Sequence, residues 1–141
     1  MDKRRKTRRC YLDGSLILIT VVETELGRIQ FTDFMPIGEE NSNIVREVKG
    51  FRGKVEVQMG LVVRPDYGIT VPWSQRIDSH TLSIVAGPHN LILRSSVELC
   101  AEEGESVAVF TICEGDTRTF TLSHGASHLP HPPILMKLRY S

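Results

Sequence analysis

The stretch RPDYGITVPW, residues 64–73, brings together the residue types of a binding loop. It holds the chain's only tryptophan with a cation, a carboxylate and a second aromatic ring, which are Trp73, Arg64, Asp66 and Tyr67. Three interpretations are open. Tyr67 and Trp73 could fold over the core as an aromatic lid with Arg64 paired to Asp66, the loop could contact another domain, or the rings could stack on a sugar. We favour the lid, because prolines at both ends order the loop and an aliphatic pair accompanies the rings.

Metal binding and glycoside cleavage have weaker support in the sequence. His124, His128 and His131 are closely spaced, but they lie in a Gly- and Pro-rich segment with no cysteine or carboxylate nearby, so we expect no metal site and no cofactor. Cleavage of a glycoside needs two carboxylates on either side of the bond, roughly 5 to 10 Å apart. The acidic residues cluster in turn segments, where water solvates them, and no nucleotide-binding or serine-nucleophile motif is present. We therefore expect no catalytic residue in this chain.

The distribution of charge and the number of cysteines indicate which partners and which compartment to expect. Six of the 17 Lys and Arg residues lie within positions 1–9. We expect these positions to form a basic, disordered arm, and without interleaved aromatics we expect no nucleic-acid partner. Cys10, Cys100 and Cys113 are an odd, widely spaced set without a C-x-x-C motif, which predicts reduced thiols and a cytoplasmic location.

One apolar run could be mistaken for a targeting segment. The run LILITVV, residues 16–22, follows the basic start but is seven residues long and is followed by ETELGR, without small residues at a cleavage position. It is also far shorter than the roughly 20 residues of a membrane helix. We interpret it as a strand and expect no membrane partner.

Apolar residues with a period of two dominate the chain. Ile29 and Phe31 alternate with Gln30 and Thr32, and the segment 54–63 alternates in the same way. Further strands are expected at 15–24, 43–49, 73–77, 81–85, 90–95, 97–101, 106–113 and 117–124. Turn residues separate these segments at short intervals, and no window has a convincing amphipathic helix. The pattern predicts an all-β protein, an antiparallel β-sandwich over residues 10–125, followed by a Pro-rich linker or extended tail over 126–141.

Several segments in order resemble one known domain. They are RRCYLDGSLILITVVETELGRIQFTDFMP, then IVREVKGFRGKVEVQMGLVVRPDYG with PW shortly after, and finally the part from GES to TFTLSHG. Over about residues 8–130 they are similar to the N-terminal, trehalase-like β-sandwich of glycoside hydrolase family 15, the glucoamylase and trehalase-like proteins. The resemblance implies a supersandwich-like fold. In that family a helical (α/α)6 barrel carries the catalytic glutamates, and this sequence contains no such barrel.

The resemblance implies a function for the chain. We expect a non-catalytic domain that packs against and positions a catalytic barrel, with Arg64, Asp66, Tyr67 and Trp73 as binding or domain-interface residues. We expect the chain alone to be inactive. The alternative is a stand-alone carbohydrate-binding or scaffold sandwich, and in either case exposed strand edges favour a homo-oligomer.

Overall fold

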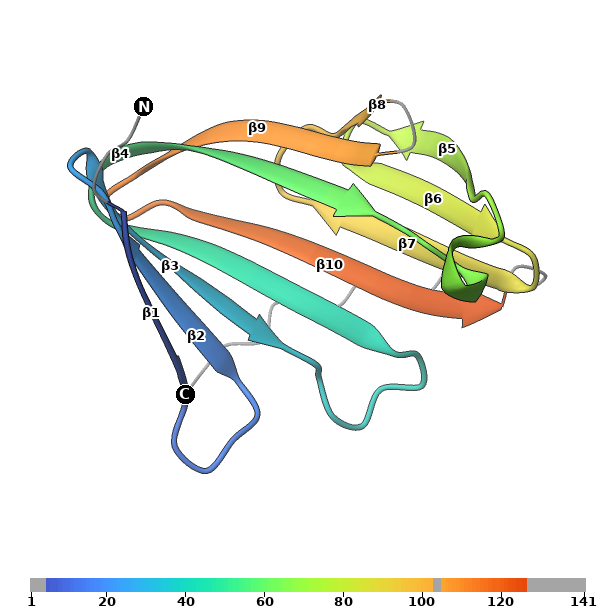
Figure 1. Ribbon diagram of the computed structural model, residues 1–141, viewed down its shortest axis with the longest axis horizontal. Helices are drawn as coiled ribbons and strands as arrows, with labels where there is room; N and C mark the ends of the chain where they lie inside the picture. The colour runs from blue at the N-terminus through green and yellow to red at the C-terminus, as the bar shows by residue number, and fades with distance from the viewer. Residues whose placement is uncertain (1–4, 103–104, 127–141) are drawn as a thin grey trace.

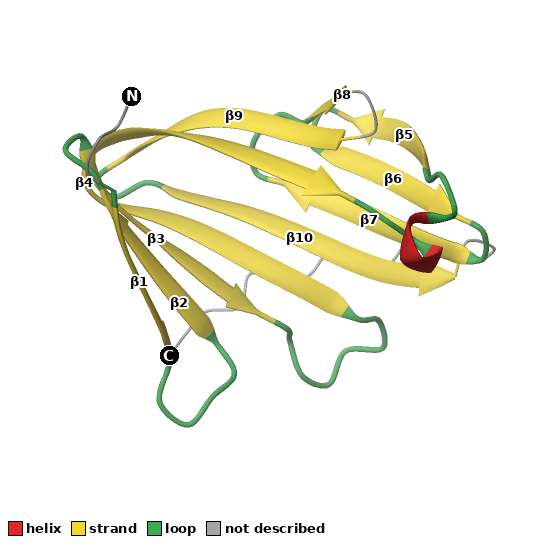
Figure 2. Ribbon diagram, in the orientation of Figure 1, coloured by secondary structure: helices red, strands yellow, loops and turns green. Residues whose placement is uncertain are grey.

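The computed structural model describes residues 5–102 and 105–126. Its elements are antiparallel strands, apart from one 3-10 turn, η1 (Asp66–Gly68) (Figures 1 and 2). The predicted all-β, antiparallel sandwich is confirmed. The strands are β1 (Lys6–Tyr11), β2 (Leu18–Glu23), β3 (Gly27–Phe34), β4 (Asn43–Val62), β5 (Trp73–Asp78), β6 (Thr81–Ala86), β7 (His89–Ser95), β8 (Cys100–Glu102), β9 (Glu105–Cys113) and β10 (Thr117–Ala126).

Two sheets share the long strand β4. The large sheet has the order β1-β2-β3-β4-β10-β7-β6-β5, and in it the first part of β4 lies between β3 and β10. The second part of β4 pairs with β9 from Lys54 to Val62, and β9 pairs with β8, which makes the small sheet. In Figure 1, β4 turns back at one end of the molecule, so its two halves belong to opposite layers. The strands expected at 43–49 and 54–63 are therefore one continuous strand.

Glycines make this bend possible. Gly53 has a positive φ of 68°, a conformation that side chains disfavour. A Cβ atom at Gly53 would collide with the carbonyl oxygen of Leu26, and one at Gly50 with the carbonyl oxygen of Cys113. The backbones of β4 and the neighbouring turns can approach this closely only without side chains.

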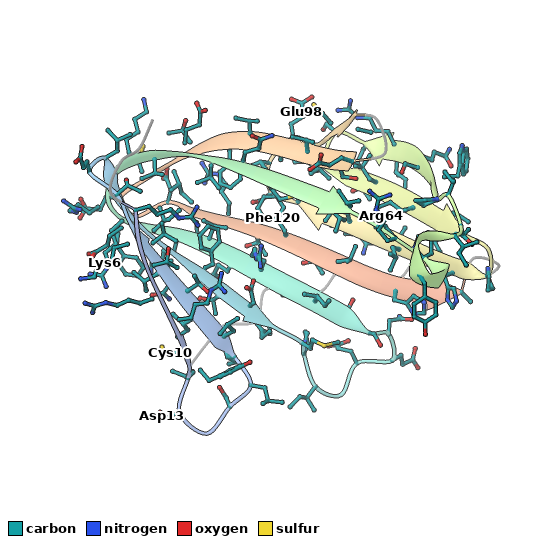
Figure 3. All side chains as sticks on the ribbon, viewed as in Figure 1. Lys6, Cys10, Asp13, Arg64, Glu98 and Phe120 are labelled. Atoms are coloured by element: carbon teal, nitrogen blue, oxygen red, sulfur yellow. The ribbon has the colours of Figure 1, made fainter. Side chains whose placement is uncertain are left out.

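The core lies between the two sheets. Its most buried side chains include Leu82, Leu99 and Ile112. Phe110 of the small sheet contacts Phe120 of the large sheet with ring centroids 5.6 Å apart, and Figure 3 labels Phe120 between the layers. Such tilted aromatic pairs join the two layers by both buried area and ring geometry.

The N-terminal segment differs from the expected disordered arm. Residues 6–9 belong to β1, which pairs with β2 over its whole length, from Lys6 opposite Glu23 to Tyr11 opposite Leu18. All six residues of β1 are exposed, so the strand has no buried face and no apolar alternation that the sequence could reveal. Backbone pairing and the Lys6–Glu23 charge match favour the strand instead. Residues 1–4 and the expected tail beyond Ala126 lie outside the described residues.

Candidate docking surface at the loop end of the sandwich

The three longest loops between described strands and most of the exposed large apolar side chains lie at one end of the sandwich, which we call the loop end. The β1–β2 loop (residues 12–17), the β3–β4 loop (35–42) and the β4–β5 loop (63–72) project there (Figure 1). The other end has tight turns, such as 24–26 and 114–116, together with the bend of β4. Because contiguous exposed apolar surface is a feature of interaction sites, the loop end is the candidate docking surface.

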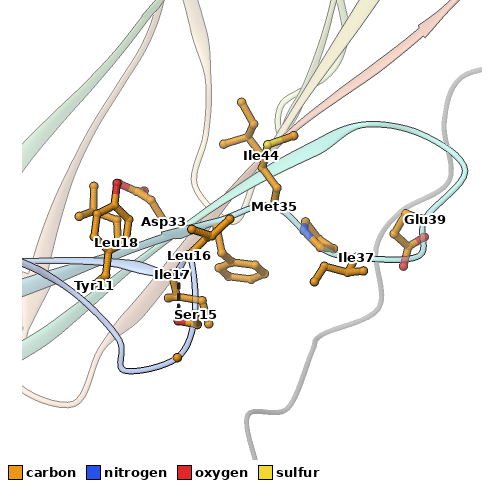
Figure 4. Close-up of a pocket in the computed structure, with 13 residues that line it drawn as sticks. Tyr11, Ser15, Leu16, Ile17, Leu18, Asp33, Met35, Ile37, Glu39 and Ile44 are labelled. Atoms are coloured by element: carbon orange, nitrogen blue, oxygen red, sulfur yellow. Dashed lines mark hydrogen bonds between the residues drawn. The ribbon is translucent and has the colours of Figure 1, made fainter.

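An apolar hollow lies between the β1–β2 and β3–β4 loops (Figure 4). Leu16 and Ile37 project from the two loops and are 89% and 99% exposed. Met35, Ile44 and Tyr11 extend the hollow and are also exposed. Large aliphatic side chains left in water at this level favour burial against another surface, at about 25 cal/mol for each Å² covered.

Local hydrogen bonds hold Leu16 in its exposed position. The backbone N–H of Ser15 donates to the carbonyl oxygen of Leu12 at 3.0 Å, and the Ser15 hydroxyl donates to the same oxygen at 2.8 Å. The N–H of Ile17 donates back to the Ser15 hydroxyl at 3.2 Å. Gly14 supplies the positive φ, 72°, that the turn requires. The loop is therefore ordered by its own polar groups, and its apolar residue projects from it.

A charged pair borders the hollow. Arg46 on β4 donates to both carboxylate oxygens of Asp33 on β3, with Nε–Oδ1 2.6 Å and Nη2–Oδ2 2.9 Å. Asp33 is directly opposite Arg46 in the register, and the guanidinium carbon lies 5.8 Å from the centre of the Phe31 ring. The hydrogen bond to Asp33 raises the pKa of Arg46 above its ordinary value. The pair matches the charge of Asp33 at one side of the hollow, whose lining also includes the carboxylate of Glu39.

The segment 64–73 is ordered, but it is not a lid over the core. Trp73 is 63% exposed, Tyr67 is fully exposed, and Ile69 and Val71 are exposed with them. The lid interpretation is wrong for a structural reason: Trp73 begins β5, an edge strand of the large sheet, and the core beneath is already filled by residues such as Leu82. Ordering comes from the backbone, where the N–H of Gly68 donates to the carbonyl oxygen of Pro65 at 2.9 Å.

The polar residues predicted to form a site in this loop are Arg64, Asp66 and Tyr67. Arg64 is exposed at the end of the green strand β4 (Figure 3). The side chain of Asp66 lies outside the described part of the structure, so the expected Arg64–Asp66 ion pair stays a prediction. Tyr67 has φ 56° and ψ 27°, which is uncommon for a residue other than glycine. The structure brings these residues into one loop, but it does not place them on the apolar hollow.

The histidines give a pair that the sequence did not suggest. His124 on β10 lies beside His89 on β7, with Nε2 and Nδ1 3.0 Å apart and ring centroids separated by 5.2 Å. Which of the two nitrogens donates the hydrogen bond depends on the tautomers of the two rings. His128 and His131 lie outside the described residues. Over residues 5–102 and 105–126, no three metal-binding side chains converge.

Sequence reasoning missed the hollow. Its members lie in turn-rich segments, DGSLI and FMPIG, where apolar residues interrupt turn signals without any period. Large apolar residues in such loops are the available signal. A sequence alone does not say whether these residues fold back into the core, as many do, or remain in solvent as Leu16 and Ile37 do here.

The structure thus defines a two-sheet antiparallel β-sandwich with an apolar surface at its loop end. Among solved structures, it is similar to one described as "Putative kojibiose phosphorylase from human microbiome", with a TM-score of 0.56 and 10% sequence identity. The match covers 87% of this chain and 19% of that chain, so this chain spans about a fifth of the length of the solved structure. At this identity the likeness is one of fold.

Further comparisons add no family assignment. No protein-family model matches the sequence, and a search of curated proteins finds no match. Over the part of the chain that the structure describes, no helix has the length and apolar character to cross a membrane.

Proposed function

We propose that this chain is a non-catalytic N-terminal β-sandwich domain of a glycoside hydrolase family 15-like protein, which packs against and positions a catalytic (α/α)6 barrel. One observation carries the proposal: a similar fold covers 19% of a chain described as a putative kojibiose phosphorylase. The ordered motifs that resemble family 15 support the finer assignment. The sandwich would act by holding the barrel in place, and it would need no cofactor of its own.

The apolar hollow is the proposed contact with the barrel. Leu16 lies on a loop that internal hydrogen bonds hold in place, and Ile37 lies on the separate loop between β3 and β4. A rigid, preformed apolar surface loses little entropy on binding, and it gains the transfer of its side chains from water. The barrel surface that it contacts would present apolar side chains of complementary shape.

We place the protein in the cytoplasm. Cys10, Cys100 and Cys113 are all exposed free thiols. Exposed, unpaired cysteines persist in reducing compartments and are oxidised or paired in secreted proteins.

The first experiment tests whether the chain alone has catalytic activity. Purified chain should release no product above a buffer blank from trehalose, maltose or starch oligosaccharides, or from kojibiose with inorganic phosphate. A turnover that survives repurification and disappears when one carboxylate is replaced would contradict a non-catalytic role.

The second experiment tests the positioning role. The coding DNA in and beside this reading frame should encode a helical barrel, and co-expression should give a complex in which the chain raises the melting temperature of the barrel. Ile37→Asp should weaken the complex, because it places a charge in the hollow. The matched control is Leu26→Asp, which changes an exposed leucine at the opposite end. A barrel whose stability and activity are the same with and without the chain would count against the proposal.

A second function has one observation in its favour. Tyr67 in η1 and Trp73 at the start of β5 are exposed aromatic rings, and exposed aromatic faces can stack on sugars. In this reading the chain is a stand-alone carbohydrate-binding sandwich. Titration with maltooligosaccharides tests it: binding that Trp73→Ala abolishes would support it, and no detectable binding at millimolar sugar would exclude it.

A further inference from the structure

The large sheet has a second face, which points away from the small sheet and which we call the outer face. Successive side chains of a strand point to opposite faces, and residues paired across two strands share one face. Leu82 on β6 pairs with Leu93 on β7, and both belong to the core between the sheets. Their neighbours Ser83 and Ile92, which also pair with each other, therefore lie on the outer face.

Part of the outer face is buried. The register continues it across the sheet, since Ile92 pairs with Ser123 on β10 and Ser123 pairs with Asn43 on β4. Ile92 and Ser123 are 0% exposed. A side chain on an open sheet face keeps some of its surface in water, so another part of the protein must cover this region. We call its buried residues the outer patch: Asn43, Val45, Ser83, Asn90, Ile92 and Ser123.

The described elements do not account for this burial. The small sheet packs on the opposite face, against the core cluster, which includes neither Ile92 nor Val45. The β3–β4 loop holds Ile37 in solvent, and the β4–β5 loop holds Tyr67 and Ile69 in solvent, so neither loop turns its large apolar side chains onto the patch. The cover therefore belongs to residues outside the described part of the chain.

The segment 127–141 has the right position and length to be this cover. It follows β10 directly, and Gly125 near the end of β10 pairs with Asn90 of the outer patch. The patch extends over β6, β7, β10 and β4, which lie side by side (Figure 1). Four strands span about 14 Å, whereas this segment could reach up to about 50 Å. The residues at 1–4 and 103–104 adjoin β1 at the far edge and the small sheet instead.

The sequence of the segment suits an extended, one-sided apolar cover. Three prolines within residues 130–133 favour an extended backbone, and the stretch ILMKLRY follows at 134–140. Alternate residues of an extended chain share one side. One side of this stretch is basic beyond Leu135, with Lys137 and Arg139. The other side is apolar throughout and consists of Ile134, Met136, Leu138 and Tyr140.

We propose that the segment 127–141 packs across the outer face of the large sheet and that its apolar side covers the outer patch. The segment then ties β4, β10, β7 and β6 together from outside, and it makes this face unavailable to other domains. The loop end of the sandwich stays free. The proposal does not depend on the catalytic barrel, so the failure of either leaves the other standing.

The reactivity of a thiol in the outer patch tests whether the patch is covered. Cys10, Cys100 and Cys113 are exposed, so replacing all three with serine removes the background reaction. In that full-length chain, Ser83→Cys places one thiol in the patch, and Val109→Cys places one at an exposed position of the small sheet as the control. The thiol at position 83 should react with a disulfide reagent at least about tenfold more slowly than the thiol at position 109.

Two changes in the segment test whether it is the cover. Ile134→Ser, Met136→Ser and Leu138→Ser together should speed the reaction at position 83 by about tenfold or more, because they remove the apolar side. Lys137→Ser with Arg139→Ser changes the basic side and should leave that rate unchanged. Circular dichroism and an unchanged rate at position 109 separate local uncovering from unfolding. If the triple variant unfolds, Met136→Ser alone should give a smaller acceleration.

A slow reaction at position 83 that the change of the apolar side relieves supports the proposal. Equal rates at positions 83 and 109 in the chain with an unchanged segment would overturn it, because the patch would then be open. Protection that persists in a folded variant without the apolar side would also overturn it, because something other than this segment would be covering the patch.

Discussion

At the scale of single residues, exposure decides what the aromatic and charged side chains can do. The sequence correctly indicated that residues 64–73 form an ordered loop, because prolines and Gly68 restrict its backbone. It did not indicate that Trp73 begins an edge strand, since strand order depends on pairings between distant segments. The aromatic residues of this segment therefore lie on the surface here, whereas in another strand order they would be part of the core.

Trp73→Ala should leave the free energy of unfolding within about 0.5 kcal/mol of the wild type, because the ring is 63% exposed. Leu82→Ala, a change at a fully buried position, should cost about 2 to 5 kcal/mol and shows that the assay detects core losses. Denaturant melts in dilute samples measure both. A loss of several kcal/mol at Trp73 would mean that the ring is buried.

The Asp33–Arg46 pair should stabilise the sheet only slightly. The Arg46 side chain is 52% exposed, so solvent screens the pair, and a double-mutant cycle with Asp33→Asn and Arg46→Gln should give a coupling of about 0.2 to 1 kcal/mol that falls as salt rises. The raised pKa of Arg46 means that this stability is present below the ordinary arginine pKa and is lost only at strongly alkaline pH. A coupling that salt leaves unchanged would contradict this description.

At the scale of elements, the bend of β4 shapes the molecule. Alternation in the sequence predicted both halves of β4, because each half has one face toward the core. The bend between them was not predicted, since Gly50 and Gly53 in a chain of short strands also fit a hairpin turn. Strand β1 was missed for the opposite reason: exposed on both faces, it has no period for the sequence to show.

Gly53→Ala should destabilise the fold by more than about 2 kcal/mol, because it combines a positive φ with a collision against the backbone of Leu26. Gly87→Ala provides the matched control. Gly87 also has a positive φ, 58°, but no atom lies within 4 Å of an added Cβ, so its cost should stay near 1 kcal/mol. Thermal or urea melts of the two variants separate the collision from the backbone strain, and equal losses would show that the close approach at the bend contributes nothing.

At the scale of the whole molecule, the two ends of the sandwich differ. One end consists of tight turns and the β4 bend, and the other carries longer loops with exposed apolar side chains (Figure 1). The fold class followed from periodicity, since period-two patterns specify half-buried strands wherever they lie in the sheet. The apolar hollow could not be predicted from periodicity, because its residues come from two loops that strand pairing brings together. The proposed domain role depends on this difference between the ends.

Hydrogen exchange of the chain, measured with and without the proposed barrel, tests the proposed docking most directly. Added barrel should slow exchange in residues 12–17 and 35–42, because docking on the hollow covers both loops, and should leave the turns at 24–26 and 114–116 unchanged. Exchange that is identical in the two samples, or protection confined to the opposite end, would contradict a domain that docks through its loop end.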